Sequence, residues 1–416
     1  LTGHNLHSTG ITTSSSVIVG GGVTISESGI EASGIGITVA NINGAQIGGR
    51  RNLIINGAMH VAQRATSSTD NGYGSVDRMS IDRNGVDEAP TQEPTNVASG
   101  TTPYSLGFRK CLKVTNGNQT SGAGEADYIR IRTRLEAREM ACSGWNYTST
   151  SSFVTLSFWV KASVAQTYQA YLKTSDGTPQ GYVFEYALSA DTWTKVVKTF
   201  PGNSNLTFDN NTYLGFEVAF LPFMGTNYTS STGNLNAWHN WHSSNSRKDM
   251  TSTWYTTNDS TFELTGIQLE VGPQATPFEH RSFSEELALC QRYCYVTPYG
   301  GSSTSASADE ETVQGSFAFN AGDDATVRVM IQFPQPMRST PTYTGSSTNA
   351  KFRSSNTSNN FSLANLASFQ MKTASNIRSM TLSVTVGSPA SMGGSSSGFI
   401  EFNAAGGFLK FESELS

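Results

Sequence analysis

The chain has 416 residues, of which 37% are hydrophobic and 14% are charged, with 40 glycines and a formal net charge of −5. Its 22 Phe, 15 Tyr and 6 Trp can form real cores, which excludes a disordered chain and allows roughly two to four domains. There is no basic stripe to bind nucleic acid, and no apolar run approaches the roughly 20 residues that a membrane-spanning helix needs.

Residues 1–50 are predicted to form short strands separated by glycines. Apolar residues alternate with polar ones in two runs, Val17, Val19, Val23 and Ile25 in the first and Ile35, Ile37 and Val39 in the second. Each strand then has one apolar face, which so short a segment cannot bury alone. We therefore expect this segment to intertwine with identical copies about a shared axis, rather than to form a flexible Gly/Ser linker.

Residues 51–280 are predicted to form one larger antiparallel β-sandwich. Many short apolar runs are separated by Gly, Asn and Pro turns, which is typical of this fold. In the run 153–160 both faces carry apolar side chains, as in a strand inside a sandwich, so we expect Trp159 and Trp193 in the core. The predicted strands are 128–134, 153–161, 168–174, 182–188, 193–200, 213–221 and 262–272.

Residues 281–296 change to a helical period and are predicted to form a connector. Ser282 with Glu285 forms a capping box, or Ser284 is itself the cap. A single apolar stripe follows, made of Leu287, Cys290, Tyr293 and Cys294. This stripe favours packing against the neighbouring domains over partner recognition.

Residues 297–416 return to strand patterns and are predicted to form a second, smaller β-sandwich. The expected strands are 312–320, 325–333, 369–372, 380–386 and 399–403, separated by Ser/Gly-rich loops. Tyr299, Tyr343 and these loops are further candidates for contact with a partner.

Two segments carry a resemblance to known families. The run Asn52-Leu53-Ile54-Ile55-Asn56-Gly57-Ala58-Met59 resembles the first strand of jelly-roll carbohydrate-binding modules, and 262–272 resembles their last strand. The stretches 52–64, 153–161 and 262–295 resemble bacteriophage tail-fibre proteins, especially those of marine phages, and the N-terminal Gly-Ile-Thr strands resemble the stems of such fibres. The resemblance covers the middle domain and the connector, whereas the C-terminal domain is placed only by position and composition.

The resemblance implies an all-β homotrimeric fibre with a stem, a lectin-like jelly roll and a distal knob, located in the virion tail. Its partners would be other tail proteins and a host cell-surface glycan or receptor. Jelly rolls also occur as plain structural modules, so the fold alone does not set the function.

A polar loop holds the strongest glycan-binding candidate. Sugars present apolar CH faces and hydroxyls, which aromatic rings flanked by polar residues can match. We take the candidate platform to be Trp238, Trp241, Trp254 and Tyr255. The alternative is that these aromatics pin a long loop to the sandwich or fill a trimer interface, as large aromatic side chains are mostly buried.

No metal or other cofactor is expected. Jelly-roll modules often bind a structural calcium, but Ala58 stands where they commonly have an acidic residue. The acidic clusters 309–311 and 323–324 lack the ligand spacing of a calcium loop and are expected to be solvated turns. The four cysteines, Cys111, Cys142, Cys290 and Cys294, are expected to be buried thiols without a disulfide framework.

Three functions remain open, namely a receptor-binding fibre, a purely structural virion component and a polysaccharide depolymerase. We expect no enzyme, because nothing pairs the candidate carboxylates Asp82, Asp87, Glu88, Glu125 and Asp127 across a sugar bond. The sequence also has no phosphate-binding loop, nucleophile elbow or zinc motif. The triplet Glu279-His280-Arg281 lacks a nucleophile and is expected to be an ion-paired corner.

Overall fold

A computed structural model describes residues 50–297 continuously and, beyond them, residues 16–19, 23–26, 29–32, 41–42, 45–46, 311–312, 317–320, 326–346, 350–354, 360–371, 376–386, 397–402 and 408–415. The chain divides into two compact units, Leu1–Gly49 and Arg50–Ser416. Among the described residues, strands make up far more of the chain than helices, and every described element of the first unit is a strand. The predicted all-β class and the β-sandwich are therefore confirmed, whereas the homotrimer remains a proposal.

The first unit contains a three-stranded antiparallel sheet of β1 (Ser16–Val19), β2 (Val23–Ser26) and β3 (Gly29–Ala32). Val17 lies opposite Ile25, so the alternating apolar positions share one register. A short pair, β4 (Asn41–Ile42) and β5 (Ala45–Gln46), follows. The strand predicted around Ile35, Ile37 and Val39 lies outside the described residues.

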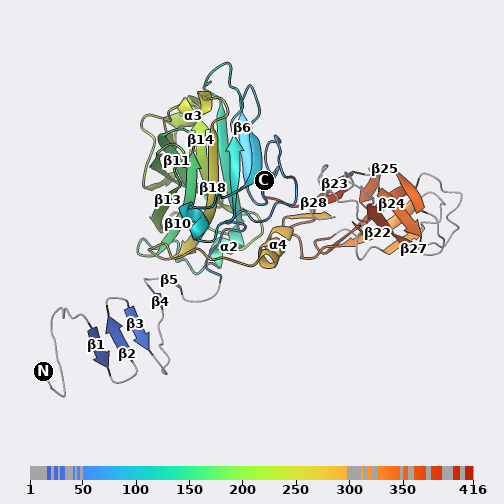
Figure 1. Cartoon of the computed structure of the whole chain (residues 1–416), viewed down its shortest axis with the longest axis horizontal. Coiled ribbons are helices and arrows are strands. Elements are labelled where there is room, and N and C mark those ends of the chain that lie inside the picture. The colour runs from blue at the N-terminus through green and yellow to red at the C-terminus, as the bar shows by residue number, and fades with distance from the viewer. Residues whose placement is uncertain are drawn as a thin grey trace. The chain divides into compact units, whose positions relative to one another are not determined.

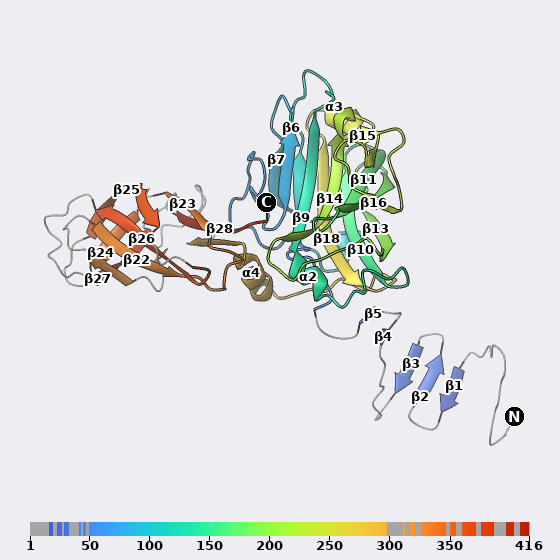
Figure 2. The same ribbon diagram turned by 180° about the vertical axis from the view of Figure 1, so that it is seen from behind.

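The larger unit contains a sandwich of two antiparallel sheets, with strand orders β13-β10-β18-β8-β7 and β16-β12-β11-β14-β9-β6 (Figure 1). Figure 2 shows β6, β9 and β14 of the larger sheet in a row. The runs predicted at 128–134, 153–161, 168–174, 182–188, 193–200, 213–221 and 262–272 are confirmed as β9 to β14 and β18. The strands are β6 (Ser80–Asn84), β7 (Thr91–Asn96), β8 (Lys110–Thr115), β9 (Tyr128–Glu136), β10 (Phe153–Ala162), β11 (Gln166–Thr174), β12 (Gln180–Leu188), β13 (Thr194–Pro201), β14 (Leu214–Met224), β16 (Trp238–Asn240) and β18 (Thr261–Val271).

Short elements surround this sandwich. The strands β15 (Thr229–Ser230) and β17 (Arg247–Lys248) pair in parallel within the long 225–250 loop. The helical segments are α1 (Thr102–Ser105), α2 (Ala137–Ala141), η1 (Thr226–Tyr228) and α3 (Thr253–Thr256). Figure 1 shows α3 at one end of the sandwich and α2 at the other.

Side chains between the two sheets form a continuous apolar core. On β10, alternate residues point inward and are fully buried, namely Val154, Leu156, Phe158 and Val160. Phe220 of the opposite sheet packs edge-on against Phe158, with 4.8 Å between ring centroids. Burial of each such side chain contributes roughly 1.5–3 kcal/mol. The core thereby fixes β10, and with it the residues on the outer face of that strand.

The segment 51–59 is not the first strand that we expected but a turn. Asn56 and Met59 have φ of 60° and 59°, which a strand does not allow. The Asn52 side chain forms two hydrogen bonds to the backbone of β18. Its Nδ2 donates to Ile267 O and its Oδ1 accepts from Leu269 N, both at 3.0 Å. Backbone bonds to β18 occur at separate points, where Leu53 N donates to Leu269 O at 2.9 Å and Ile267 N donates to Gly57 O at 3.0 Å. The prediction was wrong because the turn between these points interrupts a continuous strand.

The predicted helix is confirmed as α4 (Phe283–Gln291). Ser282 Oγ accepts from Glu285 N at 3.3 Å, and Glu285 Oε2 accepts from Ser282 N at 2.8 Å, so the capping box is present. Of the predicted stripe, Cys290 in α4 is fully buried and Leu287 is half-buried, whereas the buried Tyr293 and Cys294 follow the helix. The helix packs through Cys290 and Leu287 in a cluster with Ile55 and Val61, and its role as a connector stays a prediction.

The C-terminal strands are antiparallel and form a seven-stranded sheet, β20-β27-β21-β22-β26-β25-β24, and a three-stranded sheet, β19-β28-β23. The runs predicted at 325–333, 380–386 and 399–403 are confirmed as β22, β26 and β27. The run at 369–372 is the end of the longer β25. The strands are β19 (Cys294–Thr297), β20 (Glu311–Thr312), β21 (Phe317–Asn320), β22 (Thr326–Gln332), β23 (Thr342–Ser346), β24 (Ala350–Ser354), β25 (Asn360–Met371), β26 (Ser379–Val386), β27 (Ser397–Phe402) and β28 (Phe408–Glu412).

The end of the chain returns to residues that begin the sandwich. The buried Arg64 guanidinium donates to Glu412 at 2.9 Å and to Glu414 at 2.7 Å. Arg134 Nη1 donates to the carbonyl of the buried Leu415 at 2.6 Å. These contacts connect the end of the expected domain 297–416 to residues of the expected domain 51–280. The boundaries of both domains stay predictions.

Candidate functional site

Trp254 and Tyr255 of the expected glycan platform belong to the core. Both side chains are 0% exposed. Trp254 Nε1 donates to Thr261 O at 3.0 Å, and the Tyr255 ring stacks on Phe223 with centroids 4.6 Å apart. A ring without an exposed face cannot stack on a sugar, so these two residues are removed from the platform.

Trp238 and Trp241 are half-buried and attach the 225–250 loop to the sandwich. Trp238 Nε1 donates to Pro201 O at 2.7 Å. The Trp241 ring lies 4.7 Å from the Tyr171 ring and sits where a Cβ on Gly181 would project. Their main described contacts are therefore with the sandwich, and the four predicted residues do not share one surface.

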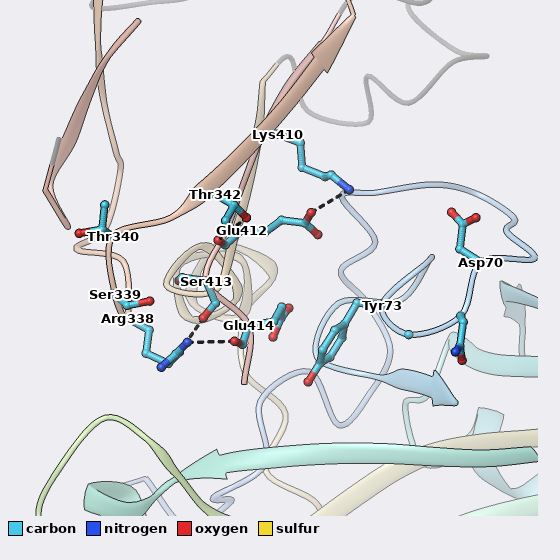
Figure 3. Close-up of a pocket in the computed structure, with 12 residues that line it drawn as sticks. Asp70, Tyr73, Arg338, Ser339, Thr340, Thr342, Lys410, Glu412, Ser413 and Glu414 are labelled. Carbon is cyan, nitrogen blue, oxygen red and sulfur yellow. Dashed lines mark hydrogen bonds and ion pairs between the residues drawn. The ribbon is translucent and has the colours of Figure 1, made fainter. Parts of the chain in front are cut away.

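A polar cleft of about 710 Å³ lies beside β28 (Figure 3). Figure 3 shows Asp70 and Tyr73 on one side of it and Arg338 and Lys410 on the other. Lys410 Nζ is paired with Glu412 at 2.9 Å, and Arg338 donates to the carbonyls of Ser413 and Glu414 at 2.6 and 2.9 Å. The full lining is Asp70, Asn71, Gly72, Tyr73, Arg338, Ser339, Thr340, Thr342, Lys410, Glu412, Ser413 and Glu414. Its charged groups are thus largely engaged within the protein.

A second hollow, which we call the aromatic groove, lies on the outer face of the smaller sheet and has a volume of about 440 Å³. Phe108 and Phe278 meet edge-on at 4.9 Å, and the His280 ring lies 4.9 Å from Phe278 and 5.1 Å from Phe108. The lining residues are Leu106, Phe108, Ser157, Trp159, Lys195, Gly266, Ala275, Thr276, Pro277, Phe278 and His280. The groove therefore offers ring faces beside hydroxyl, amine and imidazole groups, which is the combination that sugars need.

Trp159 reaches this groove because of its position on β10. Residues alternate in direction along a strand, and Trp159 shares the outer face with Ser157 and Lys161. Trp159 is half-buried there, as is Trp193 beside it. The expectation that both tryptophans lie in the core is wrong, and the parity with Ser157 and Lys161 would have placed Trp159 outside.

A β-bulge shapes the floor of the groove. Ser157 pairs with Gln268, but Trp159 pairs with Thr265, so β18 carries an extra residue at this point. Gly266 lies in the bulge with φ +63°. A Cβ on Gly266 would lie 2.7 Å from Phe108 Cζ and 3.2 Å from Trp159 Cδ1. Glycine is thus required for both the backbone conformation and the close approach of the two rings.

The triplet Glu279-His280-Arg281 forms the expected ion-paired corner at one end of the groove. Glu279 accepts from Arg51 N at 3.2 Å and Asn52 N at 2.9 Å, and pairs with Arg281 at 2.9 Å. Burial opposes ionisation of Glu279, but these donors outweigh burial and lower its pKa. The carboxylate is therefore turned away from the groove, whereas the His280 ring faces it.

The carboxylates considered for a depolymerase are engaged at separate places. Asp82 pairs with Arg132, Asp87 accepts from Ser121, and Glu88 accepts from Asn118 N. Asp127 accepts from Gly124 N at 2.6 Å. Glu125 lies two residues before Asp127 in the chain. None of the hollows described is lined by two of these five carboxylates.

The described residues contain no group of three or more His, Cys, Asp or Glu side chains that could hold a metal ion. The acidic residues 309–310 and 323–324 lie outside the described part of the chain. Cys111, Cys290 and Cys294 are buried free thiols, as expected, whereas Cys142 is exposed. Within the described residues, no helix is long and apolar enough to cross a membrane.

No family profile matches the chain, and no curated protein matches it. Similar solved structures include the enzymatically active domain of bacteriophage CBA120 tailspike protein 4, with 10% identity, a TM-score of 0.29, and 53% of this chain but 21% of that chain covered. Another is the N-terminal cellulose-binding domain of Cellulomonas fimi β-1,4-glucanase C, with 12% identity, a TM-score of 0.23, and 52% and 99% coverage. A third is the family 11 carbohydrate-binding module of Clostridium thermocellum Lic26A-Cel5E, with 13% identity, a TM-score of 0.24, and 52% and 99% coverage. At these identities and TM-scores the likenesses do not define a function.

Proposed function

We propose that this chain is a glycan-binding protein and that the aromatic groove is its binding site. The observation that carries the proposal is the half-buried Trp159 ring, which lines an open groove together with Phe278 and the exposed His280. Pyranose rings stack their CH faces on such aromatic surfaces, while flanking polar groups bond the hydroxyls. Ser157 adds a hydroxyl group and Lys195 an amine to the lining.

The groove suits a sugar better than the polar cleft beside β28. The cleft has Tyr73 as its aromatic lining residue, and its lysine is already in an ion pair. In the groove, the Phe278 and His280 rings come from one segment, and Phe278 packs against the buried Phe108 ring of another, which holds it in place. Prearranged rings bind without a large loss of side-chain entropy, which favours affinity.

We further propose that the protein is a non-enzymatic, homotrimeric tail-fibre component that attaches a bacteriophage to glycans of its host. The support is the resemblance of residues 153–161 and 262–295 to phage tail fibres. These two stretches supply Trp159, Gly266, Phe278 and His280 of the groove. One shallow site binds weakly, but three copies in a fibre and several fibres in a virion would add avidity through effective concentration.

The proposal is tested by screening the purified chain on a glycan array and then measuring affinity for the best ligand. Trp159→Ala should weaken binding about tenfold through loss of stacking. Trp193→Ala is a matched control, because this half-buried tryptophan, just before β13, packs against the same apolar cluster as Trp159 but does not line the groove. Binding that survives Trp159→Ala, or no binding to any glycan, would contradict the assigned site.

Attachment is tested separately by adding the purified chain to host cells before the phage. Dose-dependent block of adsorption that is lost with Trp159→Ala would support the fibre role. Glycan binding without any block of adsorption would favour the structural virion component over a receptor-binding fibre.

A further inference from the structure

The lining of the aromatic groove has an unbalanced charge. Lys195 and His280 are the side chains there that can be positive, and none of the described lining residues has a carboxylate. The whole chain, in contrast, has a formal net charge of −5. The groove is therefore a local exception to a surface that repels anions.

The carboxylates nearest to the groove in sequence are occupied by other partners. Glu270 accepts from the Thr276 backbone N–H at 2.8 Å and from the Thr276 hydroxyl at 2.6 Å. Glu279 is held by Arg281 and by two backbone N–H groups. These acids are thus fixed in place and are not available to neutralise Lys195.

Lys195 differs in this respect from two other lysines on the outer face. Lys161 pairs with Glu263 at 2.9 Å, and Lys113 pairs with Glu93 at 3.1 Å. Lys195 lies directly opposite Trp159 in the β10–β13 register, is exposed, and forms no ion pair with any residue that the structure describes. Its ammonium group is therefore available to a ligand that is stacked on Trp159.

His280 contributes a second polar contact in a fixed orientation. Its Nε2 lies 3.0 Å from the carbonyl oxygen of Leu106. Because a carbonyl only accepts, Nε2 must carry the hydrogen, which leaves Nδ1 for a ligand. Nδ1 can accept a bond from a sugar hydroxyl when the ring is neutral, or donate to a carboxylate when it is protonated.

We infer that the aromatic groove selects glycans with an acidic substituent, such as a uronic acid, and that Lys195 is the residue that binds the acid. This inference rests on the proposed glycan binding and adds the class of ligand. Trp159 and Phe278 supply stacking to any sugar, acidic or neutral, whereas Lys195 supplies the discrimination. Lys195 would form one partly exposed ion pair with the acidic group, which corresponds to roughly fivefold tighter binding of the acidic glycan than of the neutral one at low salt.

The experiment compares pairs of oligosaccharides with the same backbone and length, one acidic and one neutral. Oligogalacturonate with its methyl ester, and oligoalginate with its carboxyl-reduced form, are suitable pairs. The wild-type chain should bind the acidic member of the preferred pair roughly fivefold more tightly, and the preference should shrink in about 0.5 M NaCl, where charges are screened. Lys195→Gln should bind both members about equally.

Lys248→Gln is the matched control, since it removes the same charge from the exposed Lys248 of β17, away from the groove lining. It should keep the wild-type preference. Equal affinity of the wild-type chain for both members of a pair would overturn the inference and leave glycan binding intact. Binding of neither member of any pair, from a chain shown to be folded by its unfolding transition, would instead remove the proposed function itself.

Discussion

Gly266 and Trp159 are packed so closely that a Cβ on the glycine would lie 3.2 Å from Cδ1 of the indole. The same Cβ would lie 2.7 Å from the ring of Phe108. The backbone of the β18 bulge therefore contacts both rings directly, and the positions of the rings depend on its conformation. A change in the backbone at Gly266 should alter both stability and ligand binding.

Gly266→Ala should destabilise the fold by about 2–4 kcal/mol. An alanine at positive φ costs about 1–2 kcal/mol, and the overlap of its Cβ with the buried Phe108 ring and the close contact with Trp159 add about 1–2 kcal/mol more. Gly144→Ala is the matched control, because Gly144 has φ +84° but nothing within 4 Å of the added Cβ. Urea unfolding of the two variants measures the difference. Equal losses of unfolding free energy in Gly266→Ala and Gly144→Ala would mean that contact with Phe108 and Trp159 does not prevent a side chain at position 266.

Trp254→Ala should destabilise the protein far more than Trp159→Ala. Trp254 is 0% exposed, so its removal leaves a cavity that costs about 3–5 kcal/mol. Trp159 is half-buried on the outer face, and its loss should cost less than about 2 kcal/mol. Denaturant midpoints of both variants give the comparison. A larger loss for Trp159→Ala would place that side chain in the core after all.

Glu414→Gln should destabilise the fold by about 3–5 kcal/mol, because it leaves the buried Arg78 guanidinium without its carboxylate partner and removes one of the carboxylates around Arg64. The Glu414 carboxylate bridges Arg64 and Arg78, whose side chains are 3% and 2% exposed. Lys410→Gln removes the more exposed pair with Glu412 and should cost no more than about 1 kcal/mol. Thermal unfolding of the two variants tests whether the chain end stabilises the sandwich, and similar melting temperatures would argue against it.

The sandwich should lose stability in acid through Glu217. Burial alone raises the pKa of this carboxyl, but the β9 arginines beside it, Arg132, Arg130 and Arg134, outweigh burial and lower the pKa to about 2. A folded pKa below the unfolded value of 4.5 stabilises the fold above pH 4.5. That contribution, about 3 kcal/mol, is lost as the pH falls from about 4.5 to 2.

Urea unfolding of the wild type and Glu217→Gln between pH 6 and pH 2.5 measures this effect. The wild type should be the more stable protein at pH 6, and the difference in unfolding free energy should narrow as the pH falls below about 4.5, because the Glu217 carboxyl then takes up a proton in the unfolded chain before it does so in the folded one. A difference that stays constant over this range would show that folding does not lower the pKa of Glu217.

Local patterns predicted much of the fold. Alternating apolar residues identified β9 to β14, and the Ser282–Glu285 capping box identified α4. Strand β7 was missed because its sequence, Thr91–Asn96, contains Glu93 and Pro94 and has no apolar alternation. Residues 51–59 were misassigned, because their bonding depends on the Asn52 amide and on partners more than 200 residues away.

The candidate site was harder to predict than the strands. Trp254 and Tyr255 lie in a polar stretch, and their burial comes from α3 folding back against Phe223 and Thr261. Trp159 could have been assigned to the outer face from its parity with Lys161. The neighbours that turn this tryptophan into part of a groove, Phe278 and His280, come from a loop more than 100 residues away, which local patterns do not position.

The most direct test of the proposed site is ¹⁹F NMR of the chain labelled with 5-fluorotryptophan, titrated with its best glycan ligand. The six tryptophans are assigned by single Trp→Phe variants. We expect the resonance of Trp159 to shift on saturation, and those of Trp254 and Trp241 to stay in place. A shift of Trp238 and Trp241 with an unchanged Trp159 would contradict the account and return the binding surface to the 225–250 loop.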